Sequence, residues 1–285
     1  MGKIRTFEPA LSGIARRNAT ADMQTKRRFP MMGKARRIAA AIVLSLAVLG
    51  IMAAAASAGT LSASGGVVTY NAKGGEANRV TVTQSVLNGN DSITVKDGGA
   101  KVTAGAGCTG SPVHCDLGKL TKVVVNLGNK DDTLDAMGVQ VKMSIDAGSG
   151  DDTIDAGSGA DSIDGHSGVD FIHGHEGNDT IHGNDGKDHL FGEDGNDKLF
   201  GDGNDDHLTG GADNDTLDGG DGGDVMIGNA GKDTYLGRGG NDTITANDGL
   251  GGESVDCGSS LFDGNDFAHV DANDIVSNDC DNVQG

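Results

Sequence analysis

The chain lacks the residues from which a large core is built. Its 285 residues include no tryptophan, three prolines and 3% aromatic residues, against 49 glycines. Aromatic side chains bury large apolar areas, and glycine loses more conformational entropy on folding than any other residue. The composition therefore excludes a large globular core and indicates short elements that stack on one another or are held together by ions.

Catalytic signatures are also missing. His175-Glu176 is followed by Gly177-Asn178-Asp179, which is not the HExxH motif of zinc proteases, and no GxSxG nucleophile elbow occurs. Residues 59–146, about 88 residues, are too few for a typical hydrolase domain. We therefore expect that the protein is not an enzyme.

Positive charge is scarce outside the first 58 residues. The whole chain has a formal net charge of −20, and residues 147–245 contain 23 acidic and four basic residues. Such a chain repels itself and stays expanded without cations. The charge also argues against nucleic acid or an anionic membrane as a partner.

What the chain does contain is a repeat. Residues 147–245 divide into eleven consecutive nine-residue units, among them GHEGNDTIH (174–182), GNDGKDHLF (183–191) and GEDGNDKLF (192–200). The sixth place is always aspartate: Asp152, Asp161, Asp170, Asp179, Asp188, Asp197, Asp206, Asp215, Asp224, Asp233 and Asp242. The eighth place is always aliphatic, Met or Tyr: Ile154, Ile163, Ile172, Ile181, Leu190, Leu199, Leu208, Leu217, Met226, Tyr235 and Ile244.

Each unit predicts one turn and one short strand. Its first six residues are mostly Gly, Asn and Asp, which favour turns, so about three residues remain for a strand. A strand with one apolar side chain buries nothing alone, and the units must therefore stack as a solenoid. One turn reverses the chain once, so two units make a coil, and units eighteen residues apart should pair as parallel strands about 4.8 Å apart.

This stacking places the aspartates in two rows. Like charges about 5 Å apart repel by about 3 kcal/mol per pair at an effective dielectric near 20, so a cation is needed between the rungs. Carboxylates and turn carbonyls, with no thiolate nearby, suit Ca²⁺. The alternative is that Asp, Asn and Gly serve only as turn formers.

The units resemble the GGxGxDxUx pattern of RTX, or hemolysin-type, calcium-binding repeats. The resemblance implies an all-β parallel β-roll with Ca²⁺ between adjacent coils, held by the sixth-place aspartates and by carbonyls of the glycine-rich turns, on the order of nine sites. Carried onto this chain, the turn ligands start at the first-place glycines Gly165, Gly174, Gly183, Gly192, Gly201, Gly210, Gly219 and Gly228. Departures are Ala147 and Ala156 at the first place, and Asn204 and Asp213 at the fourth.

The first 58 residues predict a signal peptide with an extended n-region, and hence a secreted protein. Lys34, Arg36 and Arg37 precede the apolar run 38–56, and Ala56-Ser57-Ala58 is a small-residue cleavage signature. A membrane anchor is the alternative. We expect no membrane span in the mature chain.

The repeat is flanked by two further segments. Residues 59–146 alternate β-branched runs with turns and predict a small β domain that ends in a degenerate first coil at 127–135, before residues 136–146 break the nine-residue frame. Residues 246–285 predict a C-terminal cap. Four cysteines allow three pairings, of which Cys108–Cys115 and Cys257–Cys280 are favoured because each pair lies on one side of the repeat; a zinc site is the alternative. Both flanking segments resemble those of short secreted actinobacterial RTX-type proteins, for which the resemblance implies no activity.

Three alternatives remain for the function. The repeat histidines at 166, 173, 175, 182, 189 and 207 are expected to be solvent-facing, with a secondary Zn²⁺ or Ni²⁺ site or a pH sensor as the alternative. An exported enzyme or toxin whose repeat serves secretion is the main rival of a structural, surface or adhesion role. An ice-binding face is disfavoured because the row of threonines at the seventh place is interrupted.

Overall fold

The structure, a computed structural model, describes residues 57–87, 89–98, 101–249, 251–258 and 265–285. These belong to one compact unit, residues 53–285. The expected signal peptide lies outside the described residues except for Ser57 and Ala58, which begin the first strand. Within the described part of the chain, no helix has the length and apolar character needed to cross a membrane.

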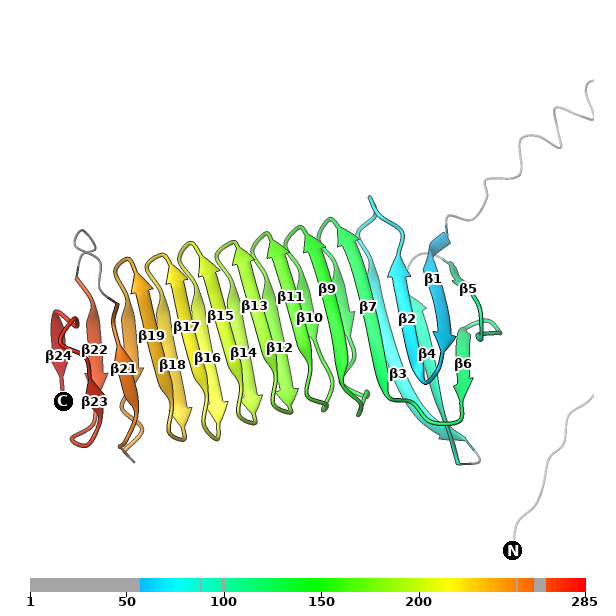
Figure 1. Cartoon of the computed structure of the whole chain (residues 1–285). Helices are drawn as coiled ribbons and strands as arrows, with labels where there is room; N and C mark the ends of the chain where they lie inside the picture. Colours follow the sequence, from blue (N-terminus) through cyan, green and yellow to red (C-terminus); the bar gives the residue numbers. More distant parts are fainter. Residues whose placement is uncertain (1–56, 88, 99–100, 250, 259–264) are drawn as a thin grey trace, which may run out of the picture. The chain divides into compact units, whose positions relative to one another are not determined.

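The described residues form strands and turns, arranged in two twelve-stranded sheets that lie one over the other (Figure 1). The first sheet contains, in spatial order, β23 (Ile275–Val276), β21 (Ser254–Asp256), β19 (Thr234–Gly239), β17 (Thr216–Asp221), β15 (Lys198–Gly203), β13 (Thr180–Asp185), β11 (Ser162–Ser167), β9 (Met143–Ser149), β7 (Lys122–Asn129), β2 (Val67–Ala72), β1 (Ser57–Ser64) and β5 (Lys101–Ala104). The second contains β24 (Asn282–Gln284), β22 (Phe267–Val270), β20 (Thr243–Ala246), β18 (Val225–Ala230), β16 (His207–Ala212), β14 (His189–Asp194), β12 (Phe171–Glu176), β10 (Thr153–Asp155), β8 (Thr133–Asp135), β3 (Arg79–Leu87), β4 (Asn90–Asp97) and β6 (Val113–Leu117).

Consecutive repeat strands alternate between the two sheets, so each coil uses two units. Strands one coil apart pair in parallel with a register of eighteen residues, as in Ile163↔Ile181 and Leu190↔Leu208. This confirms the predicted parallel β-roll with two units per coil. The eighth-place side chains form one inward-facing row in each sheet, and each of them is 0–1% exposed.

The repeat strands are longer than the three residues expected. β13 covers the seventh to ninth places of one unit and the first three places of the next, and Asn184↔Asp202 still pair although both have a positive φ. The backbone turns at the second place without leaving the ladder, because the second- and third-place residues still pair with the next coil, as in His166↔Asn184 and Ser167↔Asp185. The fourth-place N–H continues this pairing, as in Gly168 N–H to the Asp185 carbonyl at 3.0 Å. The turn is therefore shorter than the six residues that composition suggested.

The segment before the repeat is the N-terminal end of the same two sheets. The boundary expected between residues 146 and 147 coincides with no interruption: β9 crosses it and pairs with both β7 and β11. Ile145 pairs with Ile163, so the eighteen-residue register is restored within this segment. The two extra residues are Met137 and Gly138, because Ala136 N–H still bonds to the Asp155 carbonyl and Val139 already lies against Gly157 of the next coil. Two residues fit into a turn without disturbing the sheets, so a break in the sequence frame did not become a domain boundary. Antiparallel pairs, β1 with β2 and β3 with β4, occupy this end of the stack (Figure 1).

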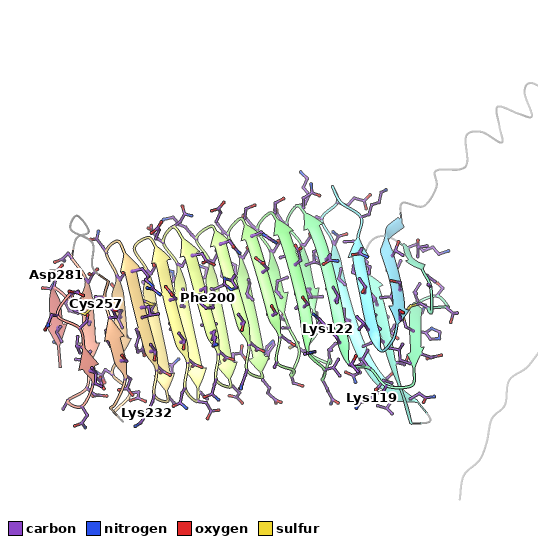
Figure 2. The ribbon with its side chains drawn as sticks, in the orientation of Figure 1. Lys119, Lys122, Phe200, Lys232, Cys257 and Asp281 are labelled. Carbon is purple, nitrogen blue, oxygen red and sulfur yellow. A yellow bond between two sulfur atoms is a disulfide. The ribbon has the colours of Figure 1, made fainter. Side chains whose placement is uncertain are left out.

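The C-terminal segment continues the stack at the other end, with β21 and β23 in one sheet and β22 and β24 in the other. Both predicted disulfides are confirmed: Cys108–Cys115 near the N-terminal hairpins and Cys257–Cys280 in the last coils. Cys257 and Asp281 lie close to that end of the roll (Figure 2).

Candidate metal centres

The sixth-place aspartates are buried in two rows. All eleven are 0–3% exposed, although their place in a turn would ordinarily leave them in water. In each row, Oδ1 of one aspartate accepts the backbone N–H of the sixth-place aspartate one coil earlier, at 2.7–2.9 Å. One carboxylate oxygen of each aspartate is thus used to join adjacent coils.

The other oxygen, Oδ2, accepts no hydrogen bond in most units. Buried Oδ2 atoms without a donor belong to Asp132, Asp152, Asp170, Asp179, Asp188, Asp197, Asp206, Asp215, Asp224 and Asp233. A buried acceptor without a partner costs about 1–3 kcal/mol, and more when it is charged. A row of such oxygens is stable only if a cation binds to it or if the carboxyls are protonated.

The first-place glycines face these oxygens. A Cβ on Gly165 would lie 2.5 Å from Asp170 Oδ2 and 3.0 Å from the carbonyl oxygen of Gly183, the first-place glycine of the next coil. We call this space, between the glycine α-carbon, its own unit's Oδ2 and the carbonyl of the next coil, a first-place site. In the same way, a Cβ would meet Oδ2 of the sixth-place aspartate at Gly174, Gly183, Gly192, Gly201, Gly210, Gly219, Gly228 and Gly237.

Hard oxygen donors therefore gather where the glycine leaves room. The first-place sites combine one carboxylate oxygen with backbone carbonyls, a donor set that suits Ca²⁺. Within the described residues, no group of three or more His, Cys, Asp or Glu side chains gathers to hold a metal, so these sites depend on the backbone for their remaining ligands. The donor chemistry fits the ion that the sequence pattern implies.

Some units depart from this arrangement. In the second unit Ala156 replaces the first-place glycine, and Asp161 Oδ2 accepts the N–H of Gly157 at 3.1 Å. At Gly228 the hydroxyl of Tyr235 occupies the first-place site, where it accepts the Gly228 N–H at 2.9 Å and donates to the Thr245 carbonyl at 3.2 Å. Asp161 therefore has no free Oδ2, whereas at Gly228 the Oδ2 of Asp233 stays without a donor and the Tyr235 hydroxyl fills the space beside it.

The fourth-place substitutions are accommodated by the backbone. Asn204 and Asp213 adopt φ values of 79° and 73°, so both take up the left-handed conformation. Asn and Asp tolerate this region better than other non-glycine residues. The coils therefore continue through both units without a change of register.

Burial raises the pKa of the sixth-place carboxyls. The hydrogen-bonded N–H of the preceding coil lowers each pKa in part, while aspartates of neighbouring coils add to the increase at many positions. The pKa rises to about 6 for Asp161, Asp170, Asp197 and Asp224, to about 7 for Asp152 and Asp179, and to about 8 for Asp206 and Asp215; it is also raised for Asp188 and Asp233. Without a cation, several of these groups retain protons near neutral pH.

The repeat histidines lie on the outer faces of the sheets, paired with carboxylates or stacked on rings. Nδ1 of His173 and of His175 lie 2.8 and 2.9 Å from the two oxygens of Glu193. His189 stacks on His207 with 4.9 Å between ring centroids, and His182 stacks on Phe200, which Figure 2 labels on the roll. His189 and His207 thus lie on an outer face, as expected for the repeat histidines, and the eighteen-residue register brings their rings together. The described residues assemble no histidine-based metal site around these rings.

The rows extend beyond the eleven repeat aspartates: the sequence pattern already placed Asp132 at a repeat position in the degenerate coil 127–135, but Asp266 and Glu253 were missed. Asp132 and Asp266 extend one row at its two ends, since Asp132 N–H donates to Asp152 Oδ1 at 2.7 Å and Asp242 N–H donates to Asp266 Oδ1 at 3.0 Å. Gly237 forms a first-place site with Asp242, and Glu253 occupies a sixth place in the other row. The signals are present in the sequence: DGLGGESVD (248–256) and DGNDFAH (263–269) keep the turn and strand pattern after short insertions.

Replacing a first-place glycine tests these sites one at a time. The methyl group of Gly183→Ala would overlap Asp188 Oδ2 and lie 3.0 Å from the Gly201 carbonyl oxygen. We expect the variant to bind fewer calcium ions and to lose roughly 1–3 kcal/mol of unfolding free energy in calcium. Equilibrium dialysis and thermal unfolding in calcium provide the measurements.

Gly118→Ala is the matched control, because a Cβ at Gly118 meets no atom within 4 Å. If Gly183→Ala binds as much calcium and unfolds at the same temperature as Gly118→Ala, the first-place sites are not ion sites.

A comparison with family models agrees with this geometry. The model described as RTX calcium-binding nonapeptide repeat (4 copies) matches residues 144–172, 164–199, 173–208, 191–226, 200–235, 209–244 and 227–249. Neither a curated protein nor a solved structure matched the chain. Residues 144–249 are therefore a tract of RTX calcium-binding nonapeptide repeats, folded as a β-roll.

Proposed function

We propose that this protein is a secreted, non-enzymatic calcium-binding protein whose acidic chain folds into the β-roll as it takes up Ca²⁺. The observation that carries the proposal is the row of buried aspartate Oδ2 atoms without a donor, most of which lie in a first-place site. A cation satisfies these oxygens and cancels the repulsion between rungs, which the narrow apolar core cannot offset. Metal binding and folding then form one event.

Different groups of the chain would space the coils, hold the ion and form the core. Oδ1 and the sixth-place N–H set the distance between coils, Oδ2 and the turn carbonyls would hold the ion, and the eighth-place side chains supply the apolar core. Bound calcium supplies positive charge to the rows. Outside the cell, where calcium is plentiful, sites of the weak extracellular class with dissociation constants of about 10⁻⁴–10⁻³ M would be filled.

Export is supported by sequence and by the disulfides. The basic residues before residue 38, the apolar run 38–56 and Ala56-Ser57-Ala58 are typical of a cleaved secretion signal. Cys108–Cys115 and Cys257–Cys280 are both bonded, as is usual in an oxidising compartment. A structural, surface or adhesion role is consistent with a rigid, ion-dependent rod-like repeat that presents no recognised catalytic motif.

The proposal is tested on protein recovered from the growth medium. We expect its first residue to be Gly59 and expect equilibrium dialysis to show several calcium ions per chain that excess Mg²⁺ does not displace, because Mg²⁺ demands a rigid octahedral shell. A screen for hydrolase activity should be negative. Three results would each contradict one part of the proposal: protein that stays in the cell fraction with residues 1–58 still attached, protein that binds no calcium, or protein that turns over a substrate.

A further inference from the structure

One buried carboxylate beyond the matched repeats, that of Glu253, lacks a hydrogen-bond donor. Glu253 stands at the sixth place of the unit 248–256, two residues out of the repeat frame, and Ser254 pairs with Thr234 on one side and with Ile275 on the other. Its side chain is 1% exposed, and neither Oε1 nor Oε2 accepts a hydrogen bond. In most repeat units one oxygen of the sixth-place aspartate lacks a donor; in Glu253 both oxygens do.

The groups around Glu253 are mainly acidic. Asp274, at the sixth place of the following coil, uses Oδ1 to accept the N–H groups of Gly252 at 2.9 Å and of Glu253 at 3.4 Å, and its Oδ2 accepts the Asp271 N–H at 2.6 Å. Asp248 of the same unit lies near enough to repel Glu253 electrostatically. Burial, together with the Asp274 carboxyl, raises the pKa of Glu253 to about 7.

The polar groups described near Glu253 do not neutralise its carboxylate. The Tyr235 hydroxyl is engaged with Gly228 and Thr245. Lys232 packs against Gly252, with Nζ 3.4 Å from the position that a Cβ on Gly252 would take, and the ion pairs among the described residues do not join it to Glu253 or Asp274. A buried carboxyl beside a second, half-buried one requires either a shared proton or a cation.

We propose that Glu253 and Asp274 hold a further calcium ion, outside residues 144–249, which fastens the last coils to the roll. The inference rests on the proposed calcium binding of the repeats, since it assumes that the same ion fills both. Asp274 lies between Cys257 and Cys280, so the ion and the disulfide would secure the same segment. The C-terminal end would then close only when calcium is present.

The experiment uses the full chain and its Glu253→Gln variant, with and without calcium. Gln is nearly isosteric, and its amide can donate to Asp274, so the variant is expected to fold. We expect wild-type protein to bind one more calcium ion than the variant in equilibrium dialysis. In hydrogen exchange, calcium should slow the amides of Gly252, Glu253 and Ile275 roughly tenfold or more in the wild type, but not in the variant, while β13 to β17 are protected in both.

Glu76→Gln is the matched control, because Glu76 is a partly exposed glutamate paired with Lys73 near the N-terminal end, and it should leave both readouts unchanged. Asp274→Asn gives a second variant with the same expected loss of one ion. If both cap variants bind as many ions as the wild type and their cap amides respond normally to calcium, the carboxyls share a proton and the inference is wrong, although the repeats still bind calcium. If the wild type binds no calcium at all, the proposed function fails as well.

Discussion

In the presence of a calcium chelator at pH 8, we expect the chain to lose most of its β-sheet signal in far-ultraviolet circular dichroism. Ten aspartates keep a buried Oδ2 without a donor. At about 1–3 kcal/mol each, ionised oxygens of this kind cost roughly 10–30 kcal/mol in sum, which exceeds the 5–15 kcal/mol by which typical domains are stable. The ion-free, fully ionised roll should therefore unfold.

Adding calcium to about millimolar concentration should restore the β signal in one cooperative transition. Mg²⁺ at the same concentration should not restore it. This ion gives up its water ligands reluctantly and is seldom held in a site made only of protein oxygens. The chain has no tryptophan, so circular dichroism or scattering is a better probe than fluorescence. A spectrum that stays β-rich after thorough chelation would show that the aspartate rows need no ion, and the proposed function would fall with it.

Protons should partly replace calcium in the ion-free chain. Unfolded aspartates titrate near 3.9, whereas burial raises the folded pKa values to between about 6 and about 8, as for Asp170 and Asp206. Between these limits the folded state binds more protons than the unfolded state, so its stability falls as the pH rises through the window. Each such carboxyl contributes up to about 1.4 kcal/mol per pH unit. We therefore expect chelated protein, expanded at pH 8, to regain β structure near pH 5.

The opposite dependence applies to calcium binding, which competes with the protons and should weaken as the pH falls from 8 to 5. Asp206→Asn removes one of the most strongly shifted carboxyls and should flatten the pH dependence of the ion-free chain. The neighbouring Asp205→Asn is the matched control, because Asp205 is exposed and its pKa is lowered by Lys187. Equal pH profiles for these two variants, or no acid-induced folding at all, would contradict the assignment of the buried rows.

The nine-residue period decided most of the fold. Because the units from 147 to 245 contain no insertion, equal places must meet every eighteen residues, and the observed register Ile163↔Ile181 follows. The eighth-place core and the two rows of sixth-place aspartates are consequences of the same period. The cysteines could be paired from their positions alone, since each pair lies close together on one side of the repeat.

Where the period is interrupted, the sequence alone misled. The two extra residues, Met137 and Gly138, suggested a domain boundary, yet the sheets continue because a turn absorbs them while the strands keep their pairing. For the same reason Glu253 and Asp274 were hidden as members of a row. The strands keep their hydrogen-bond pairing even where the number of residues in a coil changes.

The sequence by itself determined the repeat, the all-β class and the chemistry of the donors, because each depends on residue type at a fixed interval. The tertiary structure decided which oxygens remain without a donor, that Tyr235 occupies the site beside Gly228, and that the rows extend to Asp266 and Glu253. These features depend on contacts between coils. Such contacts arise from the stacking of strands in three dimensions, and no single unit of the sequence contains them.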